Sequence, residues 1–232
     1  ACTERHLSFV IGHPSFPMPD TPQLLMFILA GWLLNLTPGP DVLCIVSHSL
    51  RSGARAGIVA GLGVTAGCFV HIVAAGLGVS ALMATSAMAF SVLKWVGAAY
   101  LLYVGVRLLL SKAPDAIKIE AGSADSVTAG GLKSLFFRGF WTNALNPKVA
   151  LFFLAFLPQF TNPNEALMPQ LFVLGCICVA LNTFVDVMAV LGAHRLMQSS
   201  TARAARARVM TRLSGGTMIA LGAFLATASR EG

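Results

Sequence analysis

Three ionisable side chains lie inside otherwise apolar stretches of this chain: Asp41, Lys148 and Asp186. A charge near the centre of a membrane span costs about 2.5–3.5 kcal/mol, so such residues usually bind a charged molecule or carry a proton. Asp41 occupies the first turn after a proline, where the helix dipole favours an anion, and both capping and binding explain it. Lys148 occupies the matching turn, where the dipole disfavours a cation. It therefore requires an anionic partner: Asp41, Asp186 or the carboxylate of a substrate.

Two proline motifs surround these charges, "NLTPGPDVLC" at 35–44 and "FWTNALNPKVALFF" at 140–153. When Pro40 is aligned with Pro147, an acid follows one proline and a lysine follows the other. Spans interrupted by Gly or Pro at matching places in two halves of a chain are the best sequence indication of a transporter binding site. A plain proline kink explains a single break equally well, but two matching breaks favour a site.

Each break leaves a backbone carbonyl without its helical donor. Pro38 cannot donate to the carbonyl of Leu34, and Pro147 cannot donate to that of Asn143. Non-helical backbone at membrane depth persists only where it is buried in protein or lines a watered cavity. The freed carbonyls suit an ammonium group, and the positive N-termini of the half-helices suit a carboxylate. An amino acid carries both groups.

The two motifs therefore supply the candidate substrate-binding residues. These are Thr37, Pro38, Gly39, Pro40 and Asp41 in the first motif and Asn143, Asn146, Pro147 and Lys148 in the second. Asp41 and Asp186 are the candidates for proton coupling, because a neutral acid crosses the apolar core more cheaply than a charged one. Asp186 lies one helical turn after Asn182, so a structural hydrogen bond explains it equally well. For His71 a packed core role and a proton relay both remain open.

Composition indicates the bilayer as the solvent of these elements. The chain has 232 residues, 56% hydrophobic and 11% charged, with a mean hydropathy of +0.77, whereas soluble domains carry about 25% charged residues. A helix needs roughly 20 apolar residues to cross the bilayer. Six stretches meet this length: about 22–49, 55–83, 86–110, 134–158, 168–193 and 213–229. The sequence predicts an all-α integral membrane protein with a single six-span transporter domain over 18–232. Residues 1–17 lack periodicity, and we expect a disordered tail or a remnant foreign to the protein.

The basic residues are distributed unevenly between the two sides of these spans. Twelve Lys and Arg residues lie around the loops after spans one, three and five, against three on the opposite side. The positive-inside rule therefore places those loops in the cytoplasm and both termini outside. Three spans in each half then give two inverted three-helix repeats, with proline-broken helices one and four. The basic run at 201–212 indicates topology and contact with anionic lipid, and no nucleic acid is expected as a partner.

Small residues and cysteines in the spans have mainly structural explanations. Gly57, Gly61, Gly63 and Gly67 form small-xxx-small pairs in span two, which either pack within the protomer or support a homodimer. The cysteines are explained by packing, and the spans carry no Cys/His/Asp ligand cluster. We expect no metal site and no cofactor.

The chain resembles the LysE/RhtB family of amino-acid exporters over nearly everything after Met18. The resemblance rests on "LNLTPGPDVLCIVSHSLRSGARAGIVAGLGVTAG" (34–67), "LKWVGAAYLLYVGVRLLLS" (93–111) and "FFRGFWTNALNPKVALFFLAFLPQF" (136–160). It implies a multi-pass exporter of amino acids and related metabolites in the bacterial inner membrane, driven by the proton gradient, with six spans and central proline motifs. It also implies a transporter rather than an enzyme.

The residue types narrow the substrate class. A dibasic amino acid would need an additional buried carboxylate, whereas Asp41 and Asp186 are both needed by an α-ammonium and by Lys148. Neutral hydrogen-bonding side chains accompany them: Thr37, Asn143, Asn146 and Asn182. We therefore expect a small neutral substrate, such as threonine or homoserine, with protons as the second partner. A metal or small-ion exporter and a membrane-embedded enzyme are the alternatives.

Overall fold

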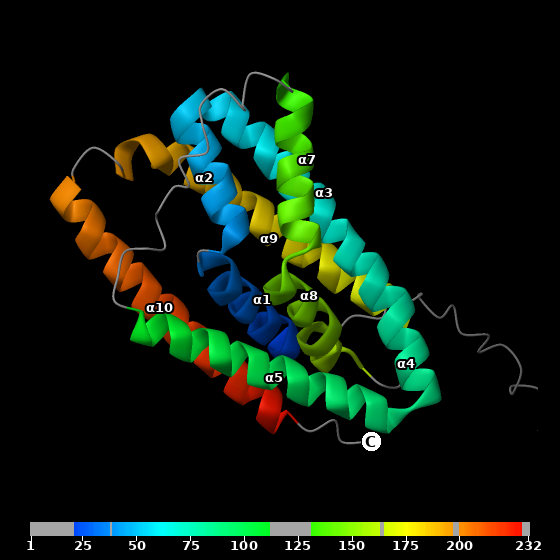
Figure 1. Ribbon diagram of the computed structural model, residues 1–232. Helices are drawn as coiled ribbons and strands as arrows, with labels where there is room; N and C mark the ends of the chain where they lie inside the picture. The colour runs from blue at the N-terminus through cyan, green and yellow to red at the C-terminus, as the bar shows by residue number, and fades with distance from the viewer. Residues whose placement is uncertain (1–20, 38, 112–130, 163–164, 197–199, 229–232) are drawn as a thin grey trace, which may run out of the picture.

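A computed structural model describes residues 21–37, 39–111, 131–162, 165–196 and 200–228 (Figure 1). The expected tail at 1–17 and the position of Pro38 lie outside these described residues. Every regular element in the described ranges is helical, as predicted. In chain order they are α1 (Thr21–Leu36), α2 (Pro40–Ser52), α3 (Ala54–Ala74), η1 (Ala75–Val79), α4 (Ser80–Thr85), α5 (Ala87–Leu110), α7 (Gly131–Ala144), α8 (Pro147–Leu151), η3 (Phe152–Phe156), η4 (Leu157–Phe160), α9 (Leu167–Leu196) and α10 (Ser200–Thr227).

The helices match the six predicted spans. Four segments are long and apolar enough to cross a membrane alone: Ala54–Met83, Ala87–Leu110, Leu167–Gly192 and Arg208–Thr227. Two further pairs meet the same test when each pair is counted as one span. The first pair, α1 and α2, bends by 53°, and the second pair, α7 followed by Pro147–Phe160, bends by 48°. Spans one and four are therefore the broken ones, as the prolines predict.

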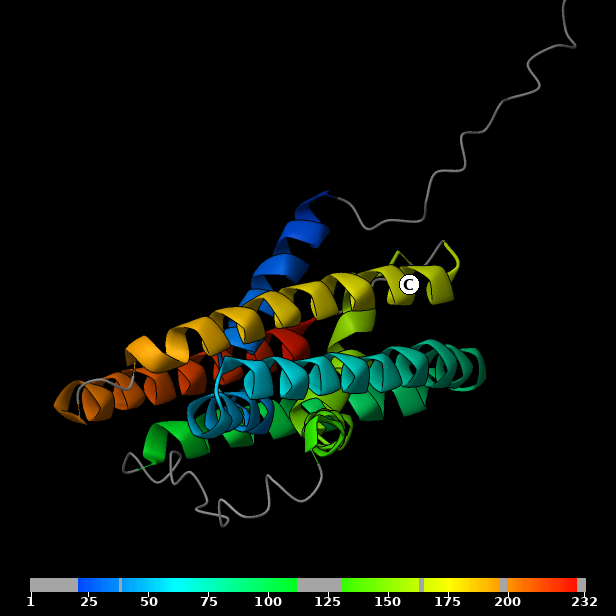
Figure 2. The ribbon, with the colours of Figure 1, turned by 90° about the horizontal axis from the view of Figure 1, so that it is seen from above.

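The two broken spans run in opposite directions. In Figure 1, α1 leads upward through its break into α2, whereas α7 leads downward through its break into α8, and both breaks lie in the middle of the molecule. The longer helices α3, α5, α9 and α10 run past them in one general orientation (Figure 2). This arrangement is that of two inverted three-helix repeats.

Glycines let several helix pairs approach until backbones touch. A Cβ added to Gly63 of α3 would overlap the carbonyl oxygen of Phe136 on α7, and one added to Gly139 would overlap that of Ala60. Similarly, Gly105 of α5 and Gly215 of α10 each place the other's carbonyl oxygen 2.8 Å from such a Cβ. The small residues of span two thus pack within the protomer. Homodimer formation remains an expectation.

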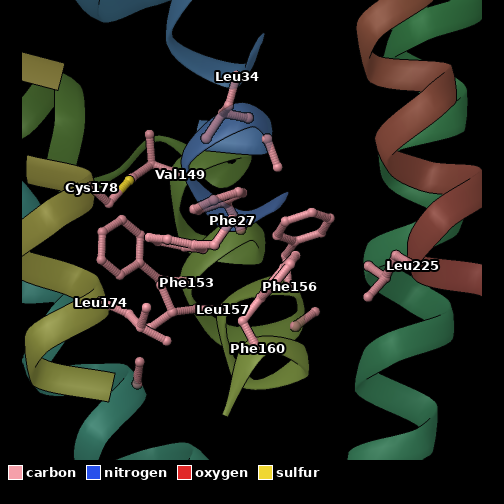
Figure 3. Close-up of a cluster of buried hydrophobic side chains, with 14 of the residues drawn as sticks. Phe27, Leu34, Val149, Phe153, Phe156, Leu157, Phe160, Leu174, Cys178 and Leu225 are labelled. Carbon is pink, nitrogen blue, oxygen red and sulfur yellow. The ribbon is translucent and has the colours of Figure 1, made fainter. Parts of the chain in front are cut away.

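Span four ends in a dense aromatic core. Its π-helical turn η3 and the following η4 bury Phe152, Phe153, Phe156 and Phe160 against α1, α9 and α10 (Figure 3). The rings of Phe152 and Phe156 stack with centroids 4.9 Å apart. The π-helical turn η3 follows directly after the second break, and π-turns often accompany functional sites in helices. Its residue Phe153 belongs both to this core and to the cavity described below.

Candidate substrate-binding site

Each break starts a new half-helix with a proline at its first position. Pro40 begins α2 and Pro147 begins α8, where a missing backbone N–H costs nothing and the fixed φ angle suits the helix. Asn146 caps α8, since its side-chain oxygen accepts a hydrogen bond from the backbone N–H of Lys148 at 3.1 Å. Gly39 occupies the equivalent position before α2 and supplies no side-chain cap.

Backbone carbonyls at each break accept hydrogen bonds from side chains of the opposite half of the protein, besides the backbone N–H groups of Thr37 to Leu34 and of Asn146 to Asn143. The ammonium of Lys148 donates to the carbonyl oxygens of Leu34 at 3.0 Å and Thr37 at 2.9 Å. In the second break, Nε2 of His71 on α3 lies 3.0 Å from the carbonyl oxygen of Asn143. Each half therefore braces the break of the other, and His71 has the packed, hydrogen-bonded position of a core histidine.

Two of the three expected anionic partners of Lys148, Asp41 and Asp186, make no direct hydrogen bond with it; the atoms in direct contact with its ammonium are two backbone oxygens. The physical reason is that the break itself supplies strong acceptors, whose dipoles can hold a desolvated cation without a full negative charge. A substrate carboxylate, the third expected partner, stays a prediction. The side chain of Lys148 is only 8% exposed. Its ammonium therefore depends mainly on these two hydrogen bonds.

Asp41 lies near the ammonium of Lys148, and one of its carboxylate oxygens makes no hydrogen bond among the described residues. It is 4% exposed, and its Oδ1 atom has no hydrogen-bond partner among the described residues. A Cβ added to Gly39 would lie 2.5 Å from this oxygen and 3.5 Å from Nζ of Lys148. Both charged groups thus face the bare backbone of Gly39, and a buried carboxylate with an unpaired oxygen is available to a ligand or proton.

Asp186 is placed by α9 next to the same region. Nδ2 of Asn182 donates to its Oδ2 at 2.8 Å, so the two side chains share a face as predicted. Its second oxygen, Oδ1, is buried without a partner in the described part of the chain. Asp41 and Lys148 are both close enough to Asp186 to interact with it electrostatically.

A small cavity joins the two breaks. It offers about 10 Å³, which is the space of roughly one water molecule. Its walls come from α1, α2, α3, α8, η3 and α9: Leu34, Asn35, Thr37, Asp41, Val42, Cys68, Lys148, Val149, Phe153, Cys178 and Asn182. No amino acid fits in this volume beside these side chains, and we call this arrangement closed.

The remaining candidates lie around this cavity in different roles. Asn143 and Asn146 are buried behind it, each with side-chain atoms that lack a partner in the described structure. Pro40 and Pro147 are exposed and shape the backbone without lining the cavity. The structure therefore brings Thr37, Asp41 and Lys148 together and places the asparagines as a second layer.

Buried apolar clusters of unequal size lie on the two sides of the cavity. On one side lies the aromatic core of η3 and η4. On the other side, one or two helical turns toward the basic ends of α2 and α3, a separate cluster contains only Ile45, Ala60, Val64 and Val190. Among the described residues, the buried apolar cluster on the basic side is thus the smaller one.

Comparisons with known proteins agree with this geometry. The sequence profile of LysE type translocators matches residues 32–229. The chain belongs to the LysE translocator family. It is 31% identical over 208 residues to a homoserine/homoserine lactone efflux protein of Salmonella typhimurium, covering 87% of this chain and 95% of the relative. An uncharacterized membrane protein of Vibrio cholerae is 31% identical over 208 residues, 88% of this chain and 96% of its own. No solved structure matches the chain.

Membership in the LysE family makes this an integral membrane transport protein, as the resemblance implied. The two proline motifs contain most of the candidates found from the sequence, but several cavity residues were missed. Cys68 and Cys178 were explained by packing, and Phe153 was not singled out; all three are buried and also line the cavity. The sequence places these residues in membrane spans but does not distinguish apolar residues at a binding site from core residues.

We expect Gly39→Ala to reduce export by this LysE-family protein at least severalfold. The backbone of Gly39 is extended, with φ −111° and ψ −177°, so alanine is not strained there. Its Cβ would instead push Asp41 away from its position, and such overpacking costs about 1–3 kcal/mol. Efflux from cells with equal membrane levels of each variant measures this. Gly216→Ala is the control, since that Cβ meets open space, and equal export by both variants would contradict the role of Gly39.

Proposed function

We propose that this protein exports small neutral amino acids or close derivatives, of the threonine and homoserine type, across the bacterial inner membrane by proton antiport. The observation that carries the proposal is the meeting of the two helix breaks around Lys148 and Asp41. A buried cation, a buried carboxylate with an unpaired oxygen and backbone carbonyls that accept from an ammonium together complement a zwitterion. The name of the Salmonella relative, a homoserine/homoserine lactone efflux protein, supports the same substrate class.

The substrate-binding role falls to the residues of the two breaks. Thr37, Asp41 and Lys148 contact the substrate, while Asn143 and Asn146 offer neutral hydrogen bonds once the cavity opens. Pro38, Gly39, Pro40 and Pro147 act through the backbone, either by freeing carbonyls or by leaving room. Lys148 either binds the substrate carboxylate or keeps Asp41 or Asp186 ionised until the substrate arrives. Asp41 and Asp186 are the proton carriers.

The polar groups of this cavity do not favour the alternative functions. Groups of three or more His, Cys, Asp or Glu residues with metal-site geometry are absent from the described residues. The site therefore offers a divalent cation little besides two carboxylates beside a competing lysine. Similarly, hydrolytic chemistry would require an activated nucleophile next to a base, and the cavity lining offers no Ser–His or Cys–His pair. We propose a transporter that is not an enzyme and uses no cofactor.

Transport by inverted membrane vesicles tests the function directly. With a proton gradient, inverted vesicles containing the protein should accumulate threonine and homoserine, because export appears there as uptake. Lysine should accumulate far less, since no additional buried carboxylate awaits its side chain. Counterflow driven by substrate on the opposite side, without a proton gradient, would distinguish a carrier from a channel. Uptake of a divalent cation without uptake of any amino acid would overturn the proposal.

The orientation of the chain is proposed with the basic loops in the cytoplasm and both termini outside. Ser52, at the end of α2, and Thr85, at the end of α4, are exposed on opposite sides of the membrane in this topology. In a variant lacking the native cysteines, we expect an impermeant thiol reagent applied to intact cells to label Thr85→Cys and not Ser52→Cys. The opposite labelling pattern would invert the orientation.

A further inference from the structure

Two backbone oxygens in the first break form a cradle of the right kind for a primary ammonium. The carbonyl of Leu34 lacks its helical donor because residue 38 is proline, so it accepts the backbone N–H of Thr37 at 3.2 Å and keeps a lone pair for a second donor. The carbonyl of Thr37 lies at the turn into α2. We call these two carbonyl oxygens the carbonyl cradle. Nζ of Lys148 occupies it, at 3.0 Å and 2.9 Å from the two oxygens.

The cradle and the cavity are closed to any second cation while Lys148 is in place. The cavity next to it offers only about 10 Å³, the space of roughly one water molecule. Two ammonium groups that shared this small buried space would also repel each other strongly. A substrate ammonium can therefore reach these oxygens only when that of Lys148 leaves them.

Lys148 has another acceptor within the range of its side chain. Oδ1 of Asp41 is buried without a hydrogen-bond partner in the described structure, and it faces the same bare side of Gly39 as Nζ of Lys148. The lysine stem has four flexible carbons, so its ammonium can change partners while its backbone stays in α8. An ammonium that left the two carbonyls for this carboxylate would therefore still have a hydrogen-bond acceptor.

We propose that the carbonyl cradle is the subsite for the α-ammonium of the substrate and that Lys148 fills it as a built-in competitor in the closed state. This inference rests on the proposed function and deepens it. Substrate binding moves Lys148 from the cradle to Asp41. The return of Lys148 to the cradle then displaces the substrate ammonium and closes the cavity, so that release and closure are one event.

Two derivatives separate this role from a simple carboxylate-binding role for Lys148. Threonine methyl ester keeps the ammonium and lacks the carboxylate charge, whereas N-acetylthreonine keeps the carboxylate and lacks the ammonium. Their binding to the purified full-length protein is measured by calorimetry. Lys148→Met should bind the ester about tenfold more tightly than the wild type if the closed state holds about nine-tenths of the molecules. Lys94→Met is the matched control, because Nζ of Lys94 also donates to a backbone carbonyl, that of Ala228 at 2.8 Å, far along the chain from the breaks.

Two results would overturn the proposal. If Lys148 only holds the substrate carboxylate, Lys148→Met leaves ester binding unchanged and weakens N-acetylthreonine binding, and the competitor role is overturned. Should Lys148→Met fail to fold, Pro38→Ala provides the second measurement: it returns an N–H to the carbonyl of Leu34, and ester binding should weaken several-fold. Unchanged ester binding by Pro38→Ala would overturn the cradle.

Transport by wild-type vesicles tests the proposed function, whereas ester binding tests the carbonyl cradle. If wild-type vesicles transport amino acids but ester binding does not respond to Lys148→Met, the cradle fails and the exporter stands. If the wild type transports no amino acid while Lys148→Met still tightens ester binding, the cradle stands as an ammonium site and the exporter fails.

Discussion

Replacing Lys148 with methionine is expected to abolish amino-acid export while leaving the protein folded in the membrane. Methionine keeps the length and apolar stem of the side chain but removes the ammonium that bridges Leu34 and Thr37. The carbonyl of Thr37 then loses this donor, at a cost of about 1–3 kcal/mol in stability, whereas the carbonyl of Leu34 keeps the backbone N–H of Thr37 at 3.2 Å. The lost function follows from the charge: no other described lysine or arginine lines the cavity.

Two further substitutions of Lys148 show which property matters. Lys148→Arg should also be impaired, because a planar guanidinium fits poorly where a compact ammonium bridges two carbonyls. Lys148→Gln keeps a hydrogen-bond donor without the charge, so its export reports on charge apart from stability. Efflux is compared at equal membrane protein levels, with Lys94→Met as control. Near wild-type export by Lys148→Met would show that the lysine is structural and that the site lies elsewhere.

Asp186→Asn is expected to end proton-driven accumulation without ending all transport. The change keeps the size of the side chain and an oxygen that can accept from Asn182, so the 2.8 Å hydrogen bond between helical neighbours can persist. The substitution removes the carboxylate that would bind a proton on one side and release it on the other. The protonated, neutral acid is the form that the apolar region tolerates at low cost. Accumulation should fall to the level of wild-type vesicles whose proton gradient has been collapsed. Exchange of threonine for threonine needs no net proton movement and should remain.

The design distinguishes the two candidate proton carriers. Asp41→Asn is measured beside Asp186→Asn, and Glu165→Gln serves as the control, because Glu165 is an exposed acid in the loop before α9. Loss of accumulation in one variant alone assigns the proton to that residue. Normal accumulation by both Asp41→Asn and Asp186→Asn would exclude both residues as carriers.

Much of the architecture could be predicted from the sequence because its causes are local. Hydrophobic length fixes where a helix can cross the membrane, and proline removes a hydrogen-bond donor wherever it occurs. The six spans, the breaks in spans one and four and the shared face of Asn182 and Asp186 all follow from such rules. The inverted repeat also followed, since an odd number of spans in each half makes the two halves run in opposite directions.

Other features were decided by tertiary structure, because they depend on residues far apart in the chain. The partners of Lys148 are 114 and 111 positions away, and no spacing rule indicates that a lysine should rest on backbone oxygens of the opposite half. The same holds for His71, which caps a carbonyl 72 positions away. Sequence alone identified which acceptors the prolines would free, and only the folded chain determined that its own side chains would occupy them, because freed acceptors in a water-poor interior bind whichever donor packing brings nearest.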